Sequence, residues 1–213
     1  MTHLFPIYLD LSGKNCLVIG GGPVAERKVE NLLEYEVNIK IVSPQVEKRI
    51  KEWSLEGSIT WLPREFEEHD LDGIFMVFVA TNDGSVNQWV VELCRQRGIL
   101  ANAVDDPPNC DFFVPSLIRH NSLVVAISTE GKSPLFARKL REELEEVITP
   151  EYGEFVEILG ELRTRIKNDV LDIELRRKIF ENLVNSDILS LLKAGEKEKA
   201  RERIEQCMSS WLA

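Results

Sequence analysis

A glycine-rich segment near the N-terminus is the first part of the sequence whose residue types and spacing point to chemistry. It reads GGGPVA and contains the pattern G-x-G-x-x-A. In such a loop Gly20 permits a tight turn, Gly22 lets the backbone approach a pyrophosphate, and Ala25 lets a helix pack closely on a strand. The N-terminus of that helix offers free N–H groups and a partial positive charge, and a first-turn proline removes only one donor. The pattern predicts that the diphosphate of a dinucleotide is bound by Gly20, Gly22, Pro23, Val24 and Ala25.

A second group of residues, Ser43, Pro44 and Gln45, follows the next predicted strand. Many NAD sites carry an acidic residue here for the ribose hydroxyls. Serine can hydrogen-bond to ribose, but it does not repel a 2′-phosphate. The nearest cations, Lys48 and Arg49, fall within a predicted helix rather than in the loop, which favours NAD over NADP. The alternative is that Ser43 simply caps a helix that has Pro44 in its first turn.

Two further polar groups follow later strands, at the sheet edge where ligands bind in such folds. The polar cluster Ala80-Thr81-Asn82-Asp83 ends an apolar run, and it contacts the ligand through residues such as Thr81 and Asn82, caps the next helix, or does both. Asp105 lies in the segment NAVDD, residues 102–106. A carboxylate at this place would take a proton as a hydride leaves a substrate. The alternative is an Asp-rich turn that precedes two prolines.

The elements that must position these residues follow from the hydrophobic pattern. The first half of the chain alternates short apolar runs with amphipathic stretches, which is typical of an α/β fold with a Rossmann-like parallel sheet. Strands are expected at residues 15–19, 38–42, 58–62, 74–80 and 99–104. Helices are expected at 24–35, 44–55 and 86–97, the last of them ending at Gly98. The longest apolar run, 74–80, is the predicted central strand.

The pattern changes after the turn-rich segment DDPPNCD. Runs with high β-propensity at 112–114 and 123–128 predict a hairpin or a small separate sheet. Ser133 with Pro134 predicts the start of a helix to about residue 148. Only helical signals follow, at 151–166, 173–184 and 196–208. The sequence therefore predicts a Rossmann-like domain at 1–111, a small α+β dimerisation domain at 112–149 and a helical segment at 150–213.

Composition excludes several classes of protein. The 213 residues are 44% hydrophobic and 29% charged, too apolar for a disordered chain and too charged for a membrane protein. The net charge of −10 argues against binding nucleic acid or an anionic membrane. No apolar run approaches the roughly 18 residues of a membrane span, and no signal peptide is evident, so a cytoplasmic protein is expected. Four separated cysteines and three histidines predict neither a disulfide framework nor a bound metal.

Several segments together resemble one enzyme family. GGGPVAERK, VATND, NAVDDP, FFVPSLI and VAISTEGKSPLFARKLR occur in that order. They resemble the precorrin-2 dehydrogenase / sirohydrochlorin ferrochelatase family, the siroheme-synthase enzymes. The resemblance is strong over residues 3–148 and loose in the helical tail. It implies the stand-alone form, without the methyltransferase domain that other members carry.

The resemblance implies an NAD-dependent oxidation of precorrin-2 to sirohydrochlorin, followed in some members by insertion of ferrous iron to give siroheme. It places the key aspartate on Asp105, for dehydrogenation, chelation or both. It also implies a homodimer, formed through the small second domain. That domain holds the segment S-x-x-G-x-S-P, which here includes Thr129 and Ser133, although some relatives have serine in place of Thr129.

A substrate with many carboxylates would be repelled at long range by a chain of this charge, so it would need a local cationic rim. The candidates for substrate binding are Arg119, His120, Thr129, Lys132, Ser133 and Arg138, with Lys139 and Arg141 adding to the charge. The alternative is a solvated helix face, on which these cations pair with Glu142 and Glu143.

A function from another class stays open. The same nucleotide domain would serve as an NAD(H)-binding redox-sensing or regulatory module without turnover, its helical tail docking a partner. A third reading is a Rossmann-like scaffold without chemistry. The enzyme requires Asp105 as an acid–base group, whereas the sensor does not.

Overall fold

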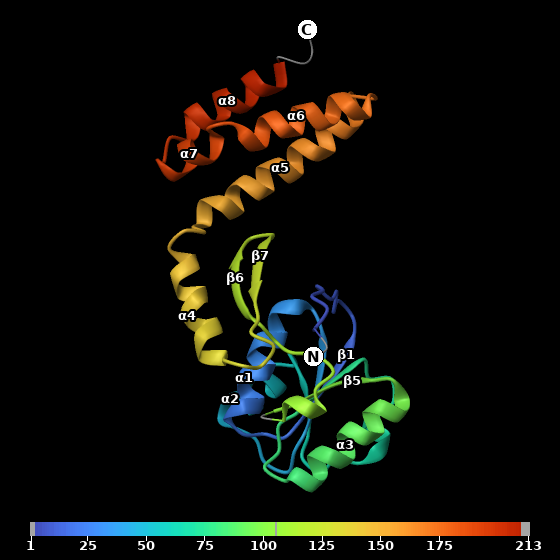
Figure 1. Ribbon diagram of the computed structural model, residues 1–213. Coiled ribbons are helices and arrows are strands. Elements are labelled where there is room, and N and C mark those ends of the chain that lie inside the picture. The colour runs from blue at the N-terminus through green and yellow to red at the C-terminus, as the bar shows by residue number, and fades with distance from the viewer. Residues whose placement is uncertain (1–2, 105, 210–213) are drawn as a thin grey trace. The chain divides into compact units, whose positions relative to one another are not determined.

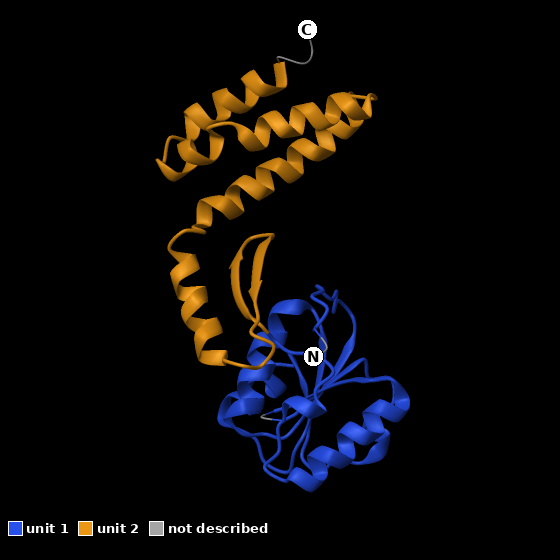
Figure 2. Ribbon diagram, in the orientation of Figure 1, with its two compact units in different colours: residues 1–114 blue, residues 115–213 orange. Residues whose placement is uncertain are grey.

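The computed structural model describes residues 3–104 and 106–209. The chain divides into two compact units, the first ending at Val114 and the second beginning at Pro115 (Figure 2). The further division that the sequence predicts near residue 149 stays a prediction. Each unit is described by itself below.

The first unit is a parallel five-stranded sheet with the strand order β3-β2-β1-β4-β5 (Figure 1). Its strands are β1 (Asn15–Ile19), β2 (Asn38–Val42), β3 (Thr60–Leu62), β4 (Met76–Val79) and β5 (Leu100–Ala103). Its helices are α1 (Pro23–Leu32), α2 (Lys48–Leu55) and α3 (Gly84–Arg97), with short 3-10 turns at η1 (Leu33–Tyr35), η2 (Glu68–Leu71) and η3 (Pro107–Asn109). The predicted α/β, Rossmann-like class is confirmed.

Side chains of the interior strands are buried on both faces of the sheet. One face packs Leu17 and Val77 with Val90 of α3, and the other packs Val18 with Val29 of α1. Two-sided burial explains the continuous apolar runs. It also explains why one prediction is wrong. The middle strand is β1, and not the run at 74–80 that was predicted to be central. Both β1 and β4 lie between two neighbours, so the length of an apolar run reports burial rather than position.

The predicted strand at 112–114 is also wrong. The hairpin begins later, because Phe112 belongs to the first unit. Its ring packs edge-to-face on Phe78 with 5.4 Å between centroids, and its carbonyl accepts a hydrogen bond from Asn102 at 2.9 Å. These contacts hold the segment between β5 and the hairpin against the sheet. The apolar residues that suggested a strand are therefore buried against the first unit instead.

The second unit is a β-hairpin followed by helices. The hairpin pairs β6 (Ser116–His120) with β7 (Leu123–Ile127) in antiparallel register. The helices are α4 (Pro134–Glu145), α5 (Pro150–Asp169), α6 (Ile173–Asn185), α7 (Ile188–Lys193) and α8 (Lys197–Ser209). The sequence did not predict the short α7. None of the helices in the described ranges is long and apolar enough to cross a membrane.

Helix α5 lies very close to the hairpin at one glycine. A Cβ added to Gly153 would overlap the backbone carbonyl of His120 on β6. The imidazole Nε2 of His120 also lies 2.8 Å from the carbonyl oxygen of Ile148, just before α5. Two contacts from one residue therefore hold the start of α5 on the end of β6.

Replacing Gly153 with alanine tests this contact. Gly153→Ala should destabilise the protein by about 1–3 kcal/mol, because the new methyl group cannot fit without moving backbone. Gly160 on the same helix is the matched control, since no described atom lies within 4 Å of an added Cβ. Gly160→Ala should stabilise by about 0.5–1 kcal/mol. Urea unfolding followed by circular dichroism compares the two variants, and equal effects would contradict the close approach.

Candidate functional site

A pocket of about 600 Å³ lies at the carboxyl ends of β1, β2 and β4. This is the sheet edge where ligands bind in open parallel sheets. Nine of the ten predicted cofactor-binding residues line it, and they come from three separate loops. They are Gly20, Gly22, Pro23, Val24, Ser43, Pro44, Gln45, Thr81 and Asn82.

The three consecutive glycines meet different surroundings. Gly20 has φ +114°, and an added Cβ would overlap the carbonyl of Ala80 at the end of β4. An added Cβ at Gly21 would overlap the carbonyl of Gln45. At Gly22, in contrast, no described atom lies within 4 Å of an added Cβ. The first two glycines therefore let strand ends meet, and the third faces open space.

Helix α1 begins beside that open space. Gly22 is its N-cap in an extended conformation, and no side chain of the described residues caps it. The N–H groups of the first turn have no partner within a helix, so those of Val24 and Ala25 are available to an anion. Ala25 itself does not line the pocket; its side chain is fully buried against the sheet. The expected close packing of helix on strand is confirmed, and any contact of Ala25 with a ligand would be through its backbone.

The loop after β2 crosses over the glycine loop before α2 begins. The N–H of Glu47 donates to the carbonyl of Gly21 at 2.8 Å, and α2 starts at Lys48 with Glu47 as its N-cap. The expectation that Pro44 lies in the first turn of this helix is wrong. Residues 43–47 are held by the neighbouring loop, which delays the helix by one turn.

Ser43 is not a helix cap either. Its hydroxyl donates to the carbonyl of Gln45 at 2.7 Å, and its own carbonyl accepts from the indole N–H of Trp61 at 2.9 Å. The side chain is almost buried, with 8% of the residue exposed. Ser43 thus fixes the shape of the pocket wall, and its contact with a ribose stays a prediction.

The polar cluster after β4 caps the next helix and also lines the pocket. One carboxylate oxygen of Asp83 accepts from the N–H groups of Ser85 at 2.9 Å and Val86 at 3.2 Å. Hydrogen bonds from the Ser85 hydroxyl and these amides lower the pKa of Asp83. Thr81 accepts from the Asp83 N–H at 3.2 Å, which tightens the turn. The structure is compatible with both expected roles of this cluster, helix capping and ligand contact.

The sequence analysis missed an aromatic wall of the same pocket. Phe66, from the loop after β3, packs edge-to-face on Trp89 of α3 with 5.3 Å between ring centroids. Trp89 is 44% exposed, so part of its ring is open to a ligand. The sequence signal that could have identified this wall is the position of Phe66 after a strand of the parallel sheet, because the carboxyl ends of parallel strands lie at one edge of the sheet.

An ion pair between the partly exposed Arg64 and the buried Asp70 anchors this loop. Both Nη atoms of Arg64 donate to the Asp70 carboxylate, at 2.7 and 2.6 Å. Burial acts to raise the pKa of Asp70, but the hydrogen bonds from Arg64 and from the Glu67 amide outweigh it and lower that pKa. The guanidinium of Arg64 also donates to the carbonyl of Glu65 at 2.9 Å, which fixes the backbone next to Phe66.

Charge in the pocket is acidic rather than basic. The described residues that line it include Glu65 and Asp83 but no Lys, Arg or His. The nearby cations of α2 have other partners: Lys48 lies 3.3 Å from Glu52, and the ion pair of Arg49 is with a residue of α1. A 2′-phosphate would therefore find no cation among the described residues that line this pocket.

Asp105 lies outside the described residues. Its neighbours in sequence are at the same sheet edge as the pocket. The N–H of Val104 donates to the carbonyl of Val79 at 3.0 Å, and the thiol of Cys110 donates to the carbonyl of Ala103 at 3.1 Å. Burial raises the pKa of that thiol. Cys110 therefore ties the turn to the strand end.

In the second unit, two predicted substrate contacts build the start of α4. The N–H of Ser133 donates to the hydroxyl of Thr129 at 3.0 Å, and the hydroxyl of Ser133 accepts from the N–H of Phe136 at 3.3 Å. His120 contacts the carbonyl of Ile148, as described above, and Arg119 is exposed on β6. Their contact with a substrate stays a prediction.

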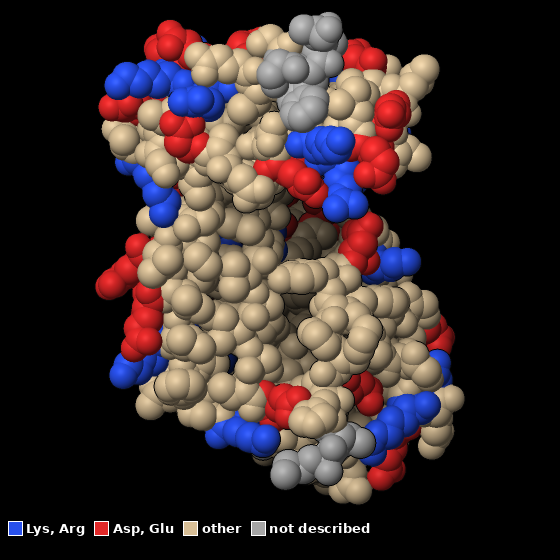
Figure 3. Space-filling view, turned by 45° about the horizontal axis from the view of Figure 1, so that its top comes forward, with Lys and Arg blue, Asp and Glu red and all other residues tan. Residues whose placement is uncertain are grey.

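The predicted cationic rim is largely neutralised by neighbouring glutamates. The ion pairs are Lys132–Glu130 at 3.9 Å, Arg138–Glu142 at 2.9 Å, Lys139–Glu143 at 3.6 Å and Arg141–Glu145 at 2.6 Å. On the face shown in Figure 3, basic and acidic side chains are likewise interspersed rather than separated by sign. The contacts match the alternative of a solvated helix face. No group of three His, Cys, Asp or Glu residues in the described ranges is placed to hold a metal ion.

A methyl group at Gly22 separates ligand contact from folding. Gly22→Ala should keep the melting temperature of the parent protein, because the added Cβ meets no described atom. It should weaken dinucleotide binding about tenfold, roughly 1.4 kcal/mol, by occupying the space in front of α1. Calorimetric titration with NAD⁺ measures the affinity. Unchanged affinity in a normally folded variant would exclude the loop as the diphosphate site.

Comparisons with known proteins agree along the chain. A family model described as putative NAD(P)-binding matches residues 7–116. Models of the sirohaem biosynthesis protein central region and the sirohaem synthase dimerisation region match 121–146 and 151–208. A siroheme synthase from Thioalkalivibrio sulfidiphilus is 38% identical over 98% of this chain, and siroheme synthase 1 from Pectobacterium atrosepticum is 38% identical over 97%.

This chain spans only 42% and 43% of the lengths of those two relatives. A solved structure described as SirC, precorrin-2 dehydrogenase, is covered over its whole length. It matches 97% of this chain with a TM-score of 0.81 and 27% identity. The NAD(P)-binding model alone covers more than half of the sequence. The chain therefore belongs to the siroheme-synthase family of NAD(P)-binding proteins that its motifs resemble.

Proposed function

We propose that this protein oxidises precorrin-2 to sirohydrochlorin with NAD⁺ as the hydride acceptor. The observation that carries the proposal is the uncapped N-terminus of α1, which opens onto a 600 Å³ pocket beside Gly22. The support from known proteins is the precorrin-2 dehydrogenase structure, which this chain matches over its full length.

The pocket fits a dinucleotide in shape and charge. The first-turn amides of α1 would hold the diphosphate, since they point to a space that only a glycine leaves open. The loop that contains Ser43 would border a ribose, and Phe66 with Trp89 would pack on an aromatic ring. The absence of Lys and Arg from the described lining favours NAD over NADP, because nothing there neutralises a 2′-phosphate.

Oxidation of the substrate removes two hydrogens as a hydride and a proton. The bound coenzyme supplies the hydride acceptor. Asp105 would take the proton, because it follows the last strand of the sheet at the edge where the pocket lies. Its carboxylate would also accept pyrrole protons if ferrous iron is inserted in a second step. The tetrapyrrole nitrogens supply the ligands for that iron, so insertion requires no preformed metal site in the protein.

Assembly and regulation are further parts of the proposal. The match of residues 151–208 to a dimerisation region supports a homodimer, although it lies C-terminal to the segment 112–149 from which the dimer was expected. An NAD(H)-binding sensor without turnover is the second candidate function, and the same pocket would serve it. The two differ in whether NADH is formed.

An anaerobic assay tests the proposal. Protein, precorrin-2 and NAD⁺ are mixed, and the absorbance of NADH is followed together with the spectrum of sirohydrochlorin. We expect both products to appear in equal amounts. Binding of NAD⁺ without NADH formation would contradict the enzyme and favour the sensor. Fe²⁺ added to sirohydrochlorin then tests chelation independently.

Asp105→Asn tests the proposed proton acceptor. The variant should fold and bind NAD⁺ normally, but lose about 10²- to 10⁴-fold in turnover, because the amide cannot take the proton. Stopped-flow measurement of NADH formation at saturating NAD⁺ gives the rate. Turnover within twofold of the parent protein would show that another group accepts the proton.

A further inference from the structure

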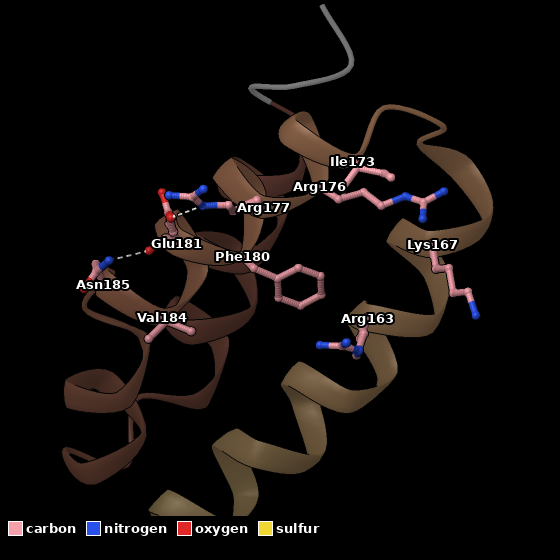
Figure 4. Close-up of a pocket in the computed structure, with 9 residues that line it drawn as sticks. All are labelled: Arg163, Lys167, Ile173, Arg176, Arg177, Phe180, Glu181, Val184 and Asn185. Carbon is pink, nitrogen blue, oxygen red and sulfur yellow. Dashed lines mark hydrogen bonds and ion pairs between the residues drawn. The ribbon is translucent and has the colours of Figure 1, made fainter.

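The helical part of the second unit contains a groove that is separate from the nucleotide pocket. It lies between α5 and α6 and has a volume of about 610 Å³. Phe180 projects from α6 into the space between the two helices and faces Arg163 of α5 (Figure 4). The guanidinium carbon of Arg163 lies 5.7 Å from the centre of the Phe180 ring, a cation–π distance.

The groove carries an excess of positive charge. Four of its nine lining residues are cations, and a single one is acidic. That acid, Glu181, is already paired with Arg177 at 2.8 Å. The other three cations are Arg163, Lys167 and Arg176. Among the described residues, no carboxylate lies within ion-pair distance of any of them. The Nε of Arg176 donates to the carbonyl of Val170 at the end of α5, but none of the three charges has a counter-ion among the described residues, on a chain whose net charge is −10.

The contrast with α4 is informative. Every cation of the predicted rim on α4 has a glutamate beside it, whereas in the α5–α6 groove only Arg177 of the four described cations has one. Arg163 and Lys167 lie one turn apart on α5 and repel each other, and this cost is relieved when an anion binds. An anion would therefore bind more strongly in the groove than on α4.

The groove also has an apolar side. Phe180 is half-buried, while Ile173 is 74% exposed and Val184 is 55% exposed. Exposed aliphatic side chains beside an aromatic ring favour a ligand with an apolar body. Together with the cations, they indicate a ligand whose apolar ring system carries several anionic groups.

We propose that the α5–α6 groove binds the carboxylate-bearing tetrapyrrole, with Arg163, Lys167 and Arg176 on its carboxylates and Phe180 against its ring system. The identity of this ligand rests on the proposed function; the requirement for an amphiphilic anion rests on the groove alone. The groove supplies the local positive charge that an acidic protein needs to attract a polycarboxylate.

Binding of uroporphyrin, a stable porphyrin with carboxylate side chains, tests this proposal without NAD⁺ or turnover. The groove variant is Arg163→Gln/Lys167→Gln. The matched control is Arg165→Gln/Lys178→Gln, which removes the same charge from exposed positions of the same helices that do not line the groove. Porphyrin fluorescence gives the affinity, and circular dichroism checks that both variants fold.

We expect the affinity to fall about tenfold or more in the groove variant and less than twofold in the control. Equal affinities in all three proteins, or equal losses in both variants, would overturn the proposal. A groove variant that changes the sedimentation coefficient but not porphyrin affinity would assign the groove to a second copy of the chain, which also overturns it.

The two proposals fail in different ways. If the parent protein forms no NADH but still binds uroporphyrin through the groove, the proposed oxidation is wrong and the groove assignment stands. If NADH forms at the same KM for precorrin-2 in the parent protein and both variants, and porphyrin affinity is also unchanged, the groove assignment is wrong and the oxidation stands.

Discussion

The close approach of backbones at Gly20 and Gly21 is the constraint on which the nucleotide pocket depends. A side chain at either position would collide with the carbonyl of Ala80 or of Gln45. Because there is none, the ends of β1, β2 and β4 converge, and α1 starts with its amides facing the space at Gly22. Any residue larger than glycine would separate the strand ends and turn the helix away from the ligand.

The parts of the fold that the sequence predicted are those set by local pattern. Strands β1 and β2 match their expected bounds, and Gly98 ends α3 with φ +68°. The errors arise where contacts between segments that are distant in the sequence determine the local structure. Pro44 precedes α2 instead of starting it, because the loop is bonded to Gly21, and Phe112 leaves the hairpin for the sheet. Neither contact has a signature within its own segment.

The same distinction holds for the sites. The glycine loop was predictable because its chemistry is carried by consecutive residues. Trp89 was not, since only the fold brings it to Phe66. Counting cations along the sequence pointed to α4, where each has a glutamate nearby, and passed over α5 and α6. Net local charge depends on which side chains pair, and the structure alone supplies that information.

The most direct test of the account is a crystal structure of the protein grown with NAD⁺. The account predicts that the diphosphate oxygens lie within hydrogen-bonding distance of the Val24 and Ala25 amides, in front of Gly22. A coenzyme that is bound elsewhere on the protein, with the space at Gly22 left to solvent, would contradict it.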